Sequence, residues 1–207
     1  MRRIAWGIAS FALAGAVQAA PQVVEWNHTR QASAGGSGCS RTDAQFIATG
    51  NQVSVIFSKL GVDLSGAAGG RTTDLKKCNI VIPAKVRKGY YLAQLQQTIT
   101  YGYNRTNNSD GKVSMVSSFY NQAAGKLERT IPTPGLNQFD EPWASASVTS
   151  NWRVTPGWCT STDYEGNFKA QLSVSGYRRT VADSIVVQVD GHDIRFDALG
   201  TPALCPR

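Results

Sequence analysis

The sequence predicts an all-β protein, an antiparallel β-sandwich of about eight strands stabilised by two disulfides. Short runs of alternating apolar and polar residues recur along the chain, and turn residues separate them. After the N-terminal segment, no stretch keeps the 3.6-residue hydrophobic period of an amphipathic helix. Four cysteines follow a segment that resembles an export signal, so we expect disulfides formed in an oxidising compartment.

Residues 1–19 are predicted to be a removable signal peptide. Arg2 and Arg3 precede an apolar stretch, and Val17-Gln18-Ala19 fits the small-x-small cleavage rule. The alternative is an N-terminal core helix or anchor, but the stretch is shorter than the ~20 residues of a membrane span. We therefore expect a secreted or periplasmic protein without a membrane span. Removal of the two arginines lowers the formal net charge from +7 to +5.

The rest of the chain divides into a short lead-in and one domain. Residues 20–38 are predicted to be a lead-in and linker, in which Val23, Val24 and Trp26 could add an edge strand. Residues 32–38 contain only Gly, Ser and Ala, a composition typical of a flexible linker. Residues 39–207 have the length of a single β-sandwich domain.

The first half of this domain shows one clear hairpin and one clear amphipathic strand. Thr49-Gly50-Asn51 separates two alternating segments, which predicts a compact hairpin over residues 44–58. Residues 61–73 are rich in Gly and Ala and are predicted to be a loop. Residues 78–82 are predicted to be a short strand that stops at Pro83. Residues 91–103 alternate so that one face is buried and the other is solvated, as in an antiparallel sheet.

The second half continues with strands over 112–121, 144–154, 168–177 and 184–189, and a long loop over 125–142. Val113, Met115 and Phe119 are expected to point inward. Asp190-Gly191 is the strongest hairpin signal, because a type I′ turn needs two residues that accept positive φ. It predicts that the chain turns there and returns over residues 193–197, so that Gly191→Val would be costly.

Several of these segments resemble a family of small secreted bacterial and fungal β-rich proteins with paired cysteines and unknown function. The segments that carry the resemblance are Gly38-Cys39, Gln52–Phe57, Lys77–Ile80, Pro83–Tyr103 and Trp158-Cys159. The resemblance implies a β-rich fold and an extracytoplasmic compartment. It implies no activity.

The four cysteines are Cys39, Cys78, Cys159 and Cys205. Sequence leaves three pairings open. Sequential order favours Cys39–Cys78 and Cys159–Cys205, because each pair would hold one half of the chain. A zinc site is the poorer interpretation, since the chain has no Cys-x-x-Cys motif.

The sequence predicts no catalytic residue, no metal site and no cofactor. There is no Gly-x-Ser-x-Gly elbow and no phosphate-binding glycine loop, and oxidised cysteines are not nucleophiles. His28 and His192 are the only histidines. Neighbours in a strand point to opposite faces, which argues against a metal site made by Asp190, His192 and Asp193. The carboxylates that could form a glycosidase pair are interpreted as solvated loop acids: Asp140, Glu141, Asp163 and Glu165.

Basic residues lie near tyrosines in two parts of the chain. Such a surface could bind envelope glycan or another anionic polymer, or it could be an ordinary solvated cationic surface. The candidate polymer-binding residues are Lys85, Arg87, Lys88, Tyr90, Tyr91, Tyr177, Arg178 and Arg179. Three tryptophans offer a second kind of sugar-stacking surface: Trp143, Trp152 and Trp158.

Together these observations predict a non-catalytic secreted or periplasmic β-sandwich of structural or adhesive type. The first alternative is a module that binds glycan or another anionic polymer weakly, and the second is a secreted hydrolase with an unrecognised site. An export signal makes an intracellular nucleic-acid partner unexpected. The oligomeric state and the ligand are left open at this point.

Overall fold

The computed structural model describes residues 23–27, 32–66, 69–90, 94–106, 108–120, 122–131, 143–151 and 162–197. These residues form two six-stranded sheets, in which every pairing is antiparallel, and one short 3-10 helix, η1 (Arg41–Asp43). The predicted all-β class is confirmed, whereas the expected number of strands was too low. The predicted signal peptide lies outside the described residues.

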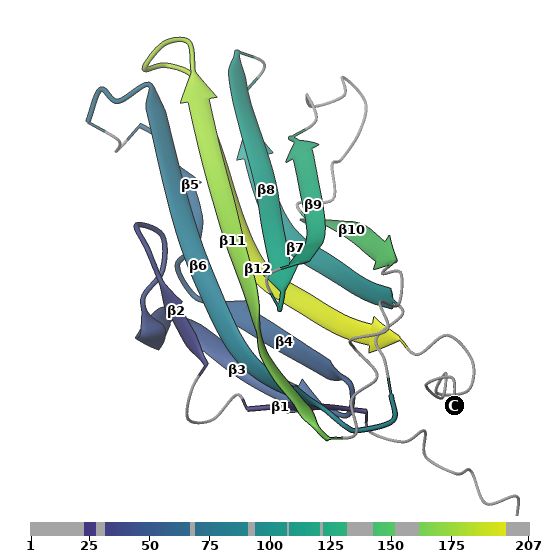
Figure 1. Ribbon diagram of the computed structural model, residues 1–207. Helices are drawn as coiled ribbons and strands as arrows, with labels where there is room; N and C mark the ends of the chain where they lie inside the picture. Colours follow the sequence, from purple (N-terminus) through teal and green to yellow (C-terminus); the bar gives the residue numbers. More distant parts are fainter. Residues whose placement is uncertain are drawn as a thin grey trace, which may run out of the picture.

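Sheet A has the strand order β1-β6-β11-β8-β9, and β2 also pairs with β6. Its three central strands run side by side along the molecule, and β11 lies between the other two (Figure 1). The strands are β1 (Val24–Trp26), β2 (Ser33–Gly35), β6 (Thr73–Val86), β8 (Ser109–Phe119), β9 (Gln122–Thr130) and β11 (Tyr164–Arg178).

Sheet B has the strand order β10-β7-β12-β4-β3, and β5 also pairs with β12. Its strands pass behind those of sheet A and cross them (Figure 1). The strands are β3 (Ala44–Thr49), β4 (Gln52–Phe57), β5 (Gly61–Asp63), β7 (Gln94–Arg105), β10 (Trp143–Asn151) and β12 (Ile185–Asp197).

The hydrophobic core lies between the two sheets and follows the period of two that the sequence shows. On β8, Val113, Met115 and Phe119 are almost completely buried, as predicted. On β7 the predicted inward face is buried as far as Tyr101. Burying one such large apolar side chain contributes about 1.5–3 kcal/mol. The largest buried apolar side chains come from both sheets: Ile80, Ile82, Met115, Phe119, Phe168, Leu172, Leu95 and Ile99.

Cys39 and Cys78 form a disulfide, which confirms the first predicted pair. Their Cα atoms are 5.4 Å apart, and both residues are buried. The bond joins the segment that leads into β3 of sheet B to β6 of sheet A. It therefore ties the two layers together. The second predicted pair, Cys159 and Cys205, lies outside the described residues.

The strand predicted to stop at Pro83 instead continues through it, and β6 is 14 residues long. The carbonyl of Pro83 accepts a hydrogen bond from the N–H of Asn27, next to β1. The nitrogen and carbonyl of one strand residue point to the same side, so the proline nitrogen faces the β1 edge. The ladder between β6 and β11 therefore needs no donor from Pro83, and the strand does not have to end.

The hairpin turn predicted at Asp190-Gly191 is wrong. β12 runs unbroken from Ile185 to Asp197, with a register shift between Val189 and Gly191 against β7. Asp190 is the extra residue of this bulge. β12 has β7 on one side and β4 and β5 on the other, and these ladders hold the chain extended where the dipeptide alone favours a turn.

Three segments predicted to lack regular structure contain strands. The expected linker over residues 32–38 includes β2, which pairs with β6. The expected loop over residues 61–73 begins with β5, and the one over residues 125–142 begins inside β9. Each segment pairs with a neighbouring strand through its backbone, β2 with β6, β5 with β12 and β9 with β8, so composition alone did not reveal them.

Candidate functional site

Three depressions follow one another along the outer face of sheet A, and we call them the upper, middle and lower depressions. Their volumes are about 610, 280 and 630 Å³. All three include backbone of the adjacent strands β6 and β11, and the upper and middle ones also include β8. The upper depression is lined by the C-terminal end of β11, which is the arrowhead end of that strand in Figure 1.

The spacing of the depressions follows the strand register. On β11 the upper depression is centred on Gly176 and the middle one on Ala170, six residues apart. The strands β6 and β8 repeat the same six-residue step. At about 3.3 Å per residue, the two centres are about 20 Å apart along the strands. The lower depression is centred on Gly166, four residues further on.

The upper depression combines exposed apolar side chains with polar groups. Tyr177 is 46% exposed and Leu75 is 49% exposed, and the register places them in neighbouring rows of β11 and β6. Ser175 and Lys112 are opposite each other in the row of Leu75. The ammonium of Lys112 lies 2.8 Å from a carboxylate oxygen of Glu128, and this contact lowers the pKa of the glutamate.

The middle depression is lined by side chains that form hydrogen bonds. The Gln171 amide donates to the Asn79 amide oxygen over 2.9 Å, and this leaves other polar atoms of both side chains toward solvent. Val116 is 55% exposed and lies opposite Gln171 on one side and Lys126 on the other. Lys169 completes the lining.

Three exposed lysines surround the middle depression on this face: Lys77, Lys126 and Lys169. None of them forms an ion pair with any part of the chain that the structure describes. Between the upper and middle depressions, the row of Lys77 continues with Ser173 and Ser114. Glu128 on β9 ends this row, and it is ion-paired with Lys112. The three lysines therefore supply positive charge that no ion pair among the described residues takes up.

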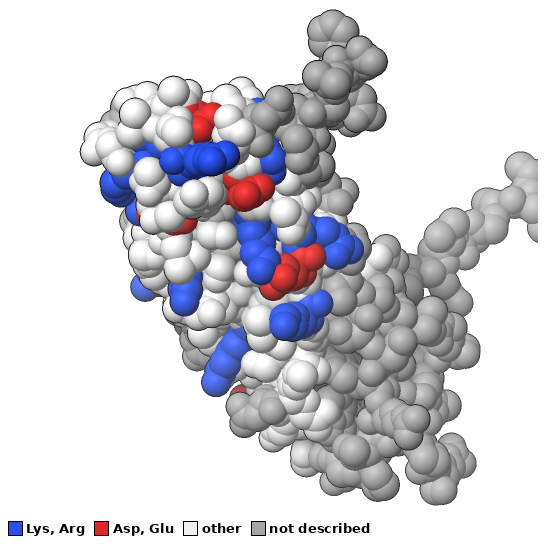
Figure 2. All heavy atoms as spheres, turned by 90° about the horizontal axis from the view of Figure 1, so that it is seen from above, with Lys and Arg blue, Asp and Glu red and all other residues white. Residues whose placement is uncertain are grey.

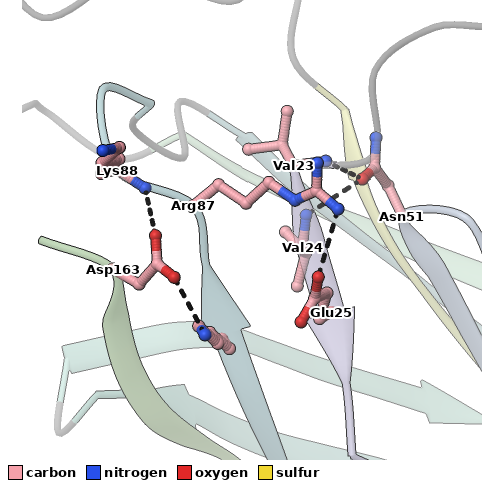
Figure 3. Close-up of polar contacts among 8 residues, drawn as sticks. Val23, Val24, Glu25, Asn51, Arg87, Lys88 and Asp163 are labelled. Atoms are coloured by element: carbon pink, nitrogen blue, oxygen red, sulfur yellow. Dashed lines mark hydrogen bonds and ion pairs between the residues drawn. The ribbon is translucent and has the colours of Figure 1, made fainter.

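The lower depression is electrically balanced. Glu25, Lys85 and Glu165 lie in one row across β1, β6 and β11. Lys85 lies 2.9 Å from Asp163, whose other oxygen accepts the backbone N–H of Lys88 (Figure 3). Hydrogen bonding with Asp163 raises the pKa of Lys85 and lowers that of the aspartate.

Arg87 is also paired at this end, because its guanidinium lies 3.2 Å from Glu25 (Figure 3). The basic run Lys85, Arg87 and Lys88 therefore faces an equal number of carboxylates, those of Glu25, Asp163 and Glu165. These exposed pairs add little stability. They do remove the excess positive charge that the sequence suggested for this segment.

The predicted polymer-binding residues do not form one patch. Lys85 and Tyr177 both lie on the outer face of sheet A, but their rows are 12 residues apart along β11, about 40 Å. Arg178 is buried, and its exposure was wrongly predicted. Tyr90 is half-buried against the core, and Arg179 is exposed beyond the end of β11.

Tyr91 of this set lies outside the described residues, as do Trp152 and Trp158, and Trp143 begins β10. On the face seen from above, the lysine and arginine side chains of the described residues are scattered, with acidic side chains between several of them (Figure 2). The basic surface of the described residues is therefore divided, and the part around the middle depression brings together unpaired lysines from three strands.

The residues considered for a metal or acid–base site do not converge. His192 is fully buried in the core, and neither ring nitrogen has a hydrogen-bond partner among the residues that the structure describes. Asp193, its neighbour on β12, has the opposite orientation, as expected for a strand. The described residues contain no group of three His, Cys, Asp or Glu side chains that could hold a metal ion. Asp140 and Glu141 lie outside them.

The side chains of the middle depression were missed by sequence reasoning. The predicted strand started at Cys78, so it did not include Lys77. β6 begins at Thr73, and this places Lys77 on the same face of the strand as Asn79. Lys126 was assigned to a loop. The period-of-two pattern over the full length of β6 is the signal that could have placed Lys77, Asn79 and Val81 together.

No family model matches this chain, and no curated protein matches it. Solved structures overlap it at low TM-scores. A structure of TmCBM61 in complex with β-1,4-galactotriose has 10% identity and a TM-score of 0.29, covering 80% of this chain and 89% of that one. The carbohydrate-binding module TmCBM27, described for mannan recognition, has 13% identity and a TM-score of 0.30, covering 84% and 89%.

A third match is the Clostridium thermocellum xylanase 10B CBM22-1-GH10 structure with xylohexaose, at 13% identity and a TM-score of 0.22. It covers 88% of this chain and 29% of that chain. At such low TM-scores, ligand-binding residues of this chain have to be identified from its own surface. The described residues include no helix long and apolar enough to span a membrane.

Proposed function

We propose that this chain is a non-catalytic extracytoplasmic β-sandwich that binds an extended glycan, preferably an anionic one, along the outer face of sheet A. The observation that carries the proposal is the alignment of the upper and middle depressions over the same three strands, six residues apart. An aligned series of shallow sites suits a polymer with a repeating unit better than a small metabolite, which is usually enclosed in one deep pocket.

The side chains of the upper depression suit a sugar ring. A pyranose has an apolar face of C–H groups and a rim of hydroxyls. Tyr177 and Leu75 offer exposed apolar surface for the face, and Ser175, Asp110 and Lys112 offer polar partners for the rim. The Asn79–Gln171 pair offers the same kind of polar partners in the middle depression.

The preference for an anionic polymer follows from the unpaired lysines. Lys77, Lys126 and Lys169 come from three different strands, and none of them has an ion-pair partner in the described part of the chain. Carboxylate or sulfate groups of a polymer would meet them without first displacing an internal partner. Because the site is open to solvent, the attraction is screened by salt.

The test compares two triple variants that change the net charge equally. The first replaces Lys77, Lys126 and Lys169 by Gln, and the second replaces Lys85, Arg87 and Lys88 by Gln. Both change exposed charges, so the free energy of unfolding should change little. Retention is measured by affinity electrophoresis in gels that contain an anionic polysaccharide such as polygalacturonate, at low and high salt.

We expect the first variant to lose retention and the second to keep it, and we expect high salt to release the wild-type chain. Equal loss in both variants would mean that only net charge matters and would overturn the assigned site. No retention of the wild-type chain on anionic or neutral polysaccharides would overturn polymer binding altogether. Release of soluble sugar during incubation would overturn the non-catalytic part and favour a hydrolase.

A further inference from the structure

β3 is an edge strand of sheet B, and it presents backbone groups that pair with no strand in the described part of the chain. It pairs with β4, and no other described strand lies beside it. The Ser58 N–H donates to the Asp43 carbonyl, so the backbone groups of Asp43 point toward β4. Along β3, residues whose backbone groups point toward β4 alternate with residues whose groups point away from it. By that alternation, the N–H and C=O groups of Ala44, Phe46 and Ala48 point away from β4. Among the described residues, none of these six groups has a backbone partner.

The other edge strands are short, charged or covered. β10, at the opposite edge of sheet B, is also uncharged, but β9 of sheet A packs beside it. β1 and β2 have only three residues each. β9 carries the charged residues Lys126, Glu128 and Arg129 and lies near β10. β3 has six residues, Ala-Gln-Phe-Ile-Ala-Thr, and contains no charged residue and no proline. An uncharged edge of this length is a template for pairing with another strand.

Two exposed isoleucines lie beside this edge on the outer face of sheet B. Ile47 on β3 is 42% exposed, and Ile56 on β4 is 45% exposed. Ile47 is opposite Ser54, and Ile56 is opposite Gln45, so the two isoleucines are diagonal neighbours. The apolar surface therefore spans both strands of the hairpin and reaches the open edge.

We propose that β3 pairs with β3 of a second copy of this chain, antiparallel and about a two-fold axis at Phe46. Phe46 is then opposite the partner's Phe46, and Ala44 is opposite the partner's Ala48. These three pairs satisfy all the outward backbone groups with six hydrogen bonds. Ile47 comes diagonal to the partner's Ile47, so the isoleucines of both copies join into one apolar stripe.

The edge fits a second copy better than an unrelated extended peptide for two reasons. A two-fold axis brings identical side chains together, and β3 has no charge that would repel its own copy. The exposed apolar surface lies on two strands, and a second hairpin offers the same two strands in return. β3 belongs to sheet B and the glycan site to sheet A, so dimerisation and polymer binding can be lost separately.

The first experiment measures molecular mass by sedimentation equilibrium over a wide range of chain concentration. We expect a reversible dimer. Ala48→Pro removes one outward N–H but no bond to β4, so the hairpin is retained and the dimer should dissociate at least about tenfold more readily, equivalent to about 1.4 kcal/mol. Val181→Lys, at a 60% exposed position away from β3, is the control and should dimerise like the wild type.

The second experiment tests the register. In the proposed pairing Gln45 is opposite the partner's Ile47, with Cα atoms about 4.5 Å apart, within the range for a disulfide. Gln45→Cys combined with Ile47→Cys should therefore form a covalent dimer on mild oxidation, whereas either single variant should not. A wild-type chain that stays monomeric at every concentration would overturn the proposal. A dimer that Ala48→Pro leaves intact, or crosslinking by the single variants, would also overturn it.

Discussion

At the scale of single residues, two adjacent arginines that look alike in the sequence have different roles. Arg178 is 1% exposed, and its guanidinium donates to the carbonyls of Leu64, Ser65, Arg71, Val181 and Asp183. These carbonyls belong to the connections at one end of the sandwich. Arg179 is exposed, and its backbone N–H donates to the Asn108 carbonyl, whereas its guanidinium has no hydrogen bond or ion pair to the described part of the chain.

We therefore expect Arg178→Met to lower the free energy of unfolding by at least about 3 kcal/mol, because several buried carbonyls lose a charged donor. Arg179→Met should change it by no more than about 0.5 kcal/mol. Urea unfolding of both variants checks this. Equal effects of the two substitutions would show that the carbonyl contacts of Arg178 do not stabilise the fold.

His192 makes the stability depend on acid in a defined window. Burial lowers its pKa from the ordinary value of 6.5 to about 3, because the charged ring would lose its hydration. As the pH falls below about 6.5, the unfolded chain binds a proton that the folded chain does not bind. Stability is then lost by up to about 1.4 kcal/mol per pH unit until the pH reaches the folded pKa.

His192→Leu removes this proton linkage and two buried ring nitrogens that have no hydrogen-bond partner within the described ranges. The free energy of unfolding of the variant minus that of the wild type should increase steadily as the pH is lowered from 7 to 4. Above pH 7 this difference should stay constant. Urea titrations at several pH values measure the difference, in which the other titrating groups cancel. A difference that does not change with pH would show that His192 is accessible to protons in the folded state.

At the scale of elements, two turn-like dipeptides had opposite outcomes. Gly50 has φ of 58° and closes the β3–β4 hairpin as predicted. Gly191 lies within β12, where ladders on both sides keep the chain extended. Local sequence predicted the first turn because the hairpin is a local structure. It failed at the second because the strands that override it are far away in the sequence.

The same comparison predicts how glycines respond to substitution. A Cβ on Gly191 would meet nothing closer than the Val55 carbonyl oxygen at 3.8 Å. We expect Gly191→Ala to leave the free energy of unfolding unchanged or raise it by up to about 1 kcal/mol. A Cβ on Gly61 would lie 2.7 Å from the Val187 carbonyl oxygen, a backbone atom that cannot move aside.

Gly61→Ala should therefore lower stability by about 1–3 kcal/mol. Thermal unfolding of the two variants, side by side, measures the contrast. A large loss for Gly191→Ala would restore a tight turn at that position and contradict the continuous β12.

The Cys39–Cys78 disulfide is the element-scale link that the sequence predicted correctly. It closes a loop of 39 residues, so the chain-entropy estimate gives about 3–4 kcal/mol of stabilisation. We expect the double variant Cys39→Ala, Cys78→Ala to lose about this amount in urea unfolding under non-reducing conditions. An unchanged midpoint would mean that the bond adds no stability to the fold.

At the scale of the whole molecule, charge clusters in the sequence and in space are different sets. Lys85, Arg87 and Lys88 are close in sequence, but the fold places Glu25 and Asp163 beside them. The unpaired lysines come from β6, β9 and β11 and meet only through the sheet register. A single sequence predicts the fold class and the alternation of each strand, but it does not contain the register that assembles the surface.

The distance between the upper and middle depressions predicts how binding depends on ligand length. Their centres, Gly176 and Ala170, are about 20 Å apart along β11. An oligosaccharide shorter than this can occupy only one depression, whereas a longer one occupies both and gains affinity through the second contact as an intramolecular event. We expect affinity to rise steeply at an oligomer length of about 20 Å and to level off once both the upper and the middle depressions are filled. Calorimetric titration with size-graded oligogalacturonides measures this step, and Tyr177→Ala should flatten it by removing the upper contact. If a disaccharide binds as tightly as a long oligomer, a single depression is the whole site, and the strand-aligned surface is not a polymer track.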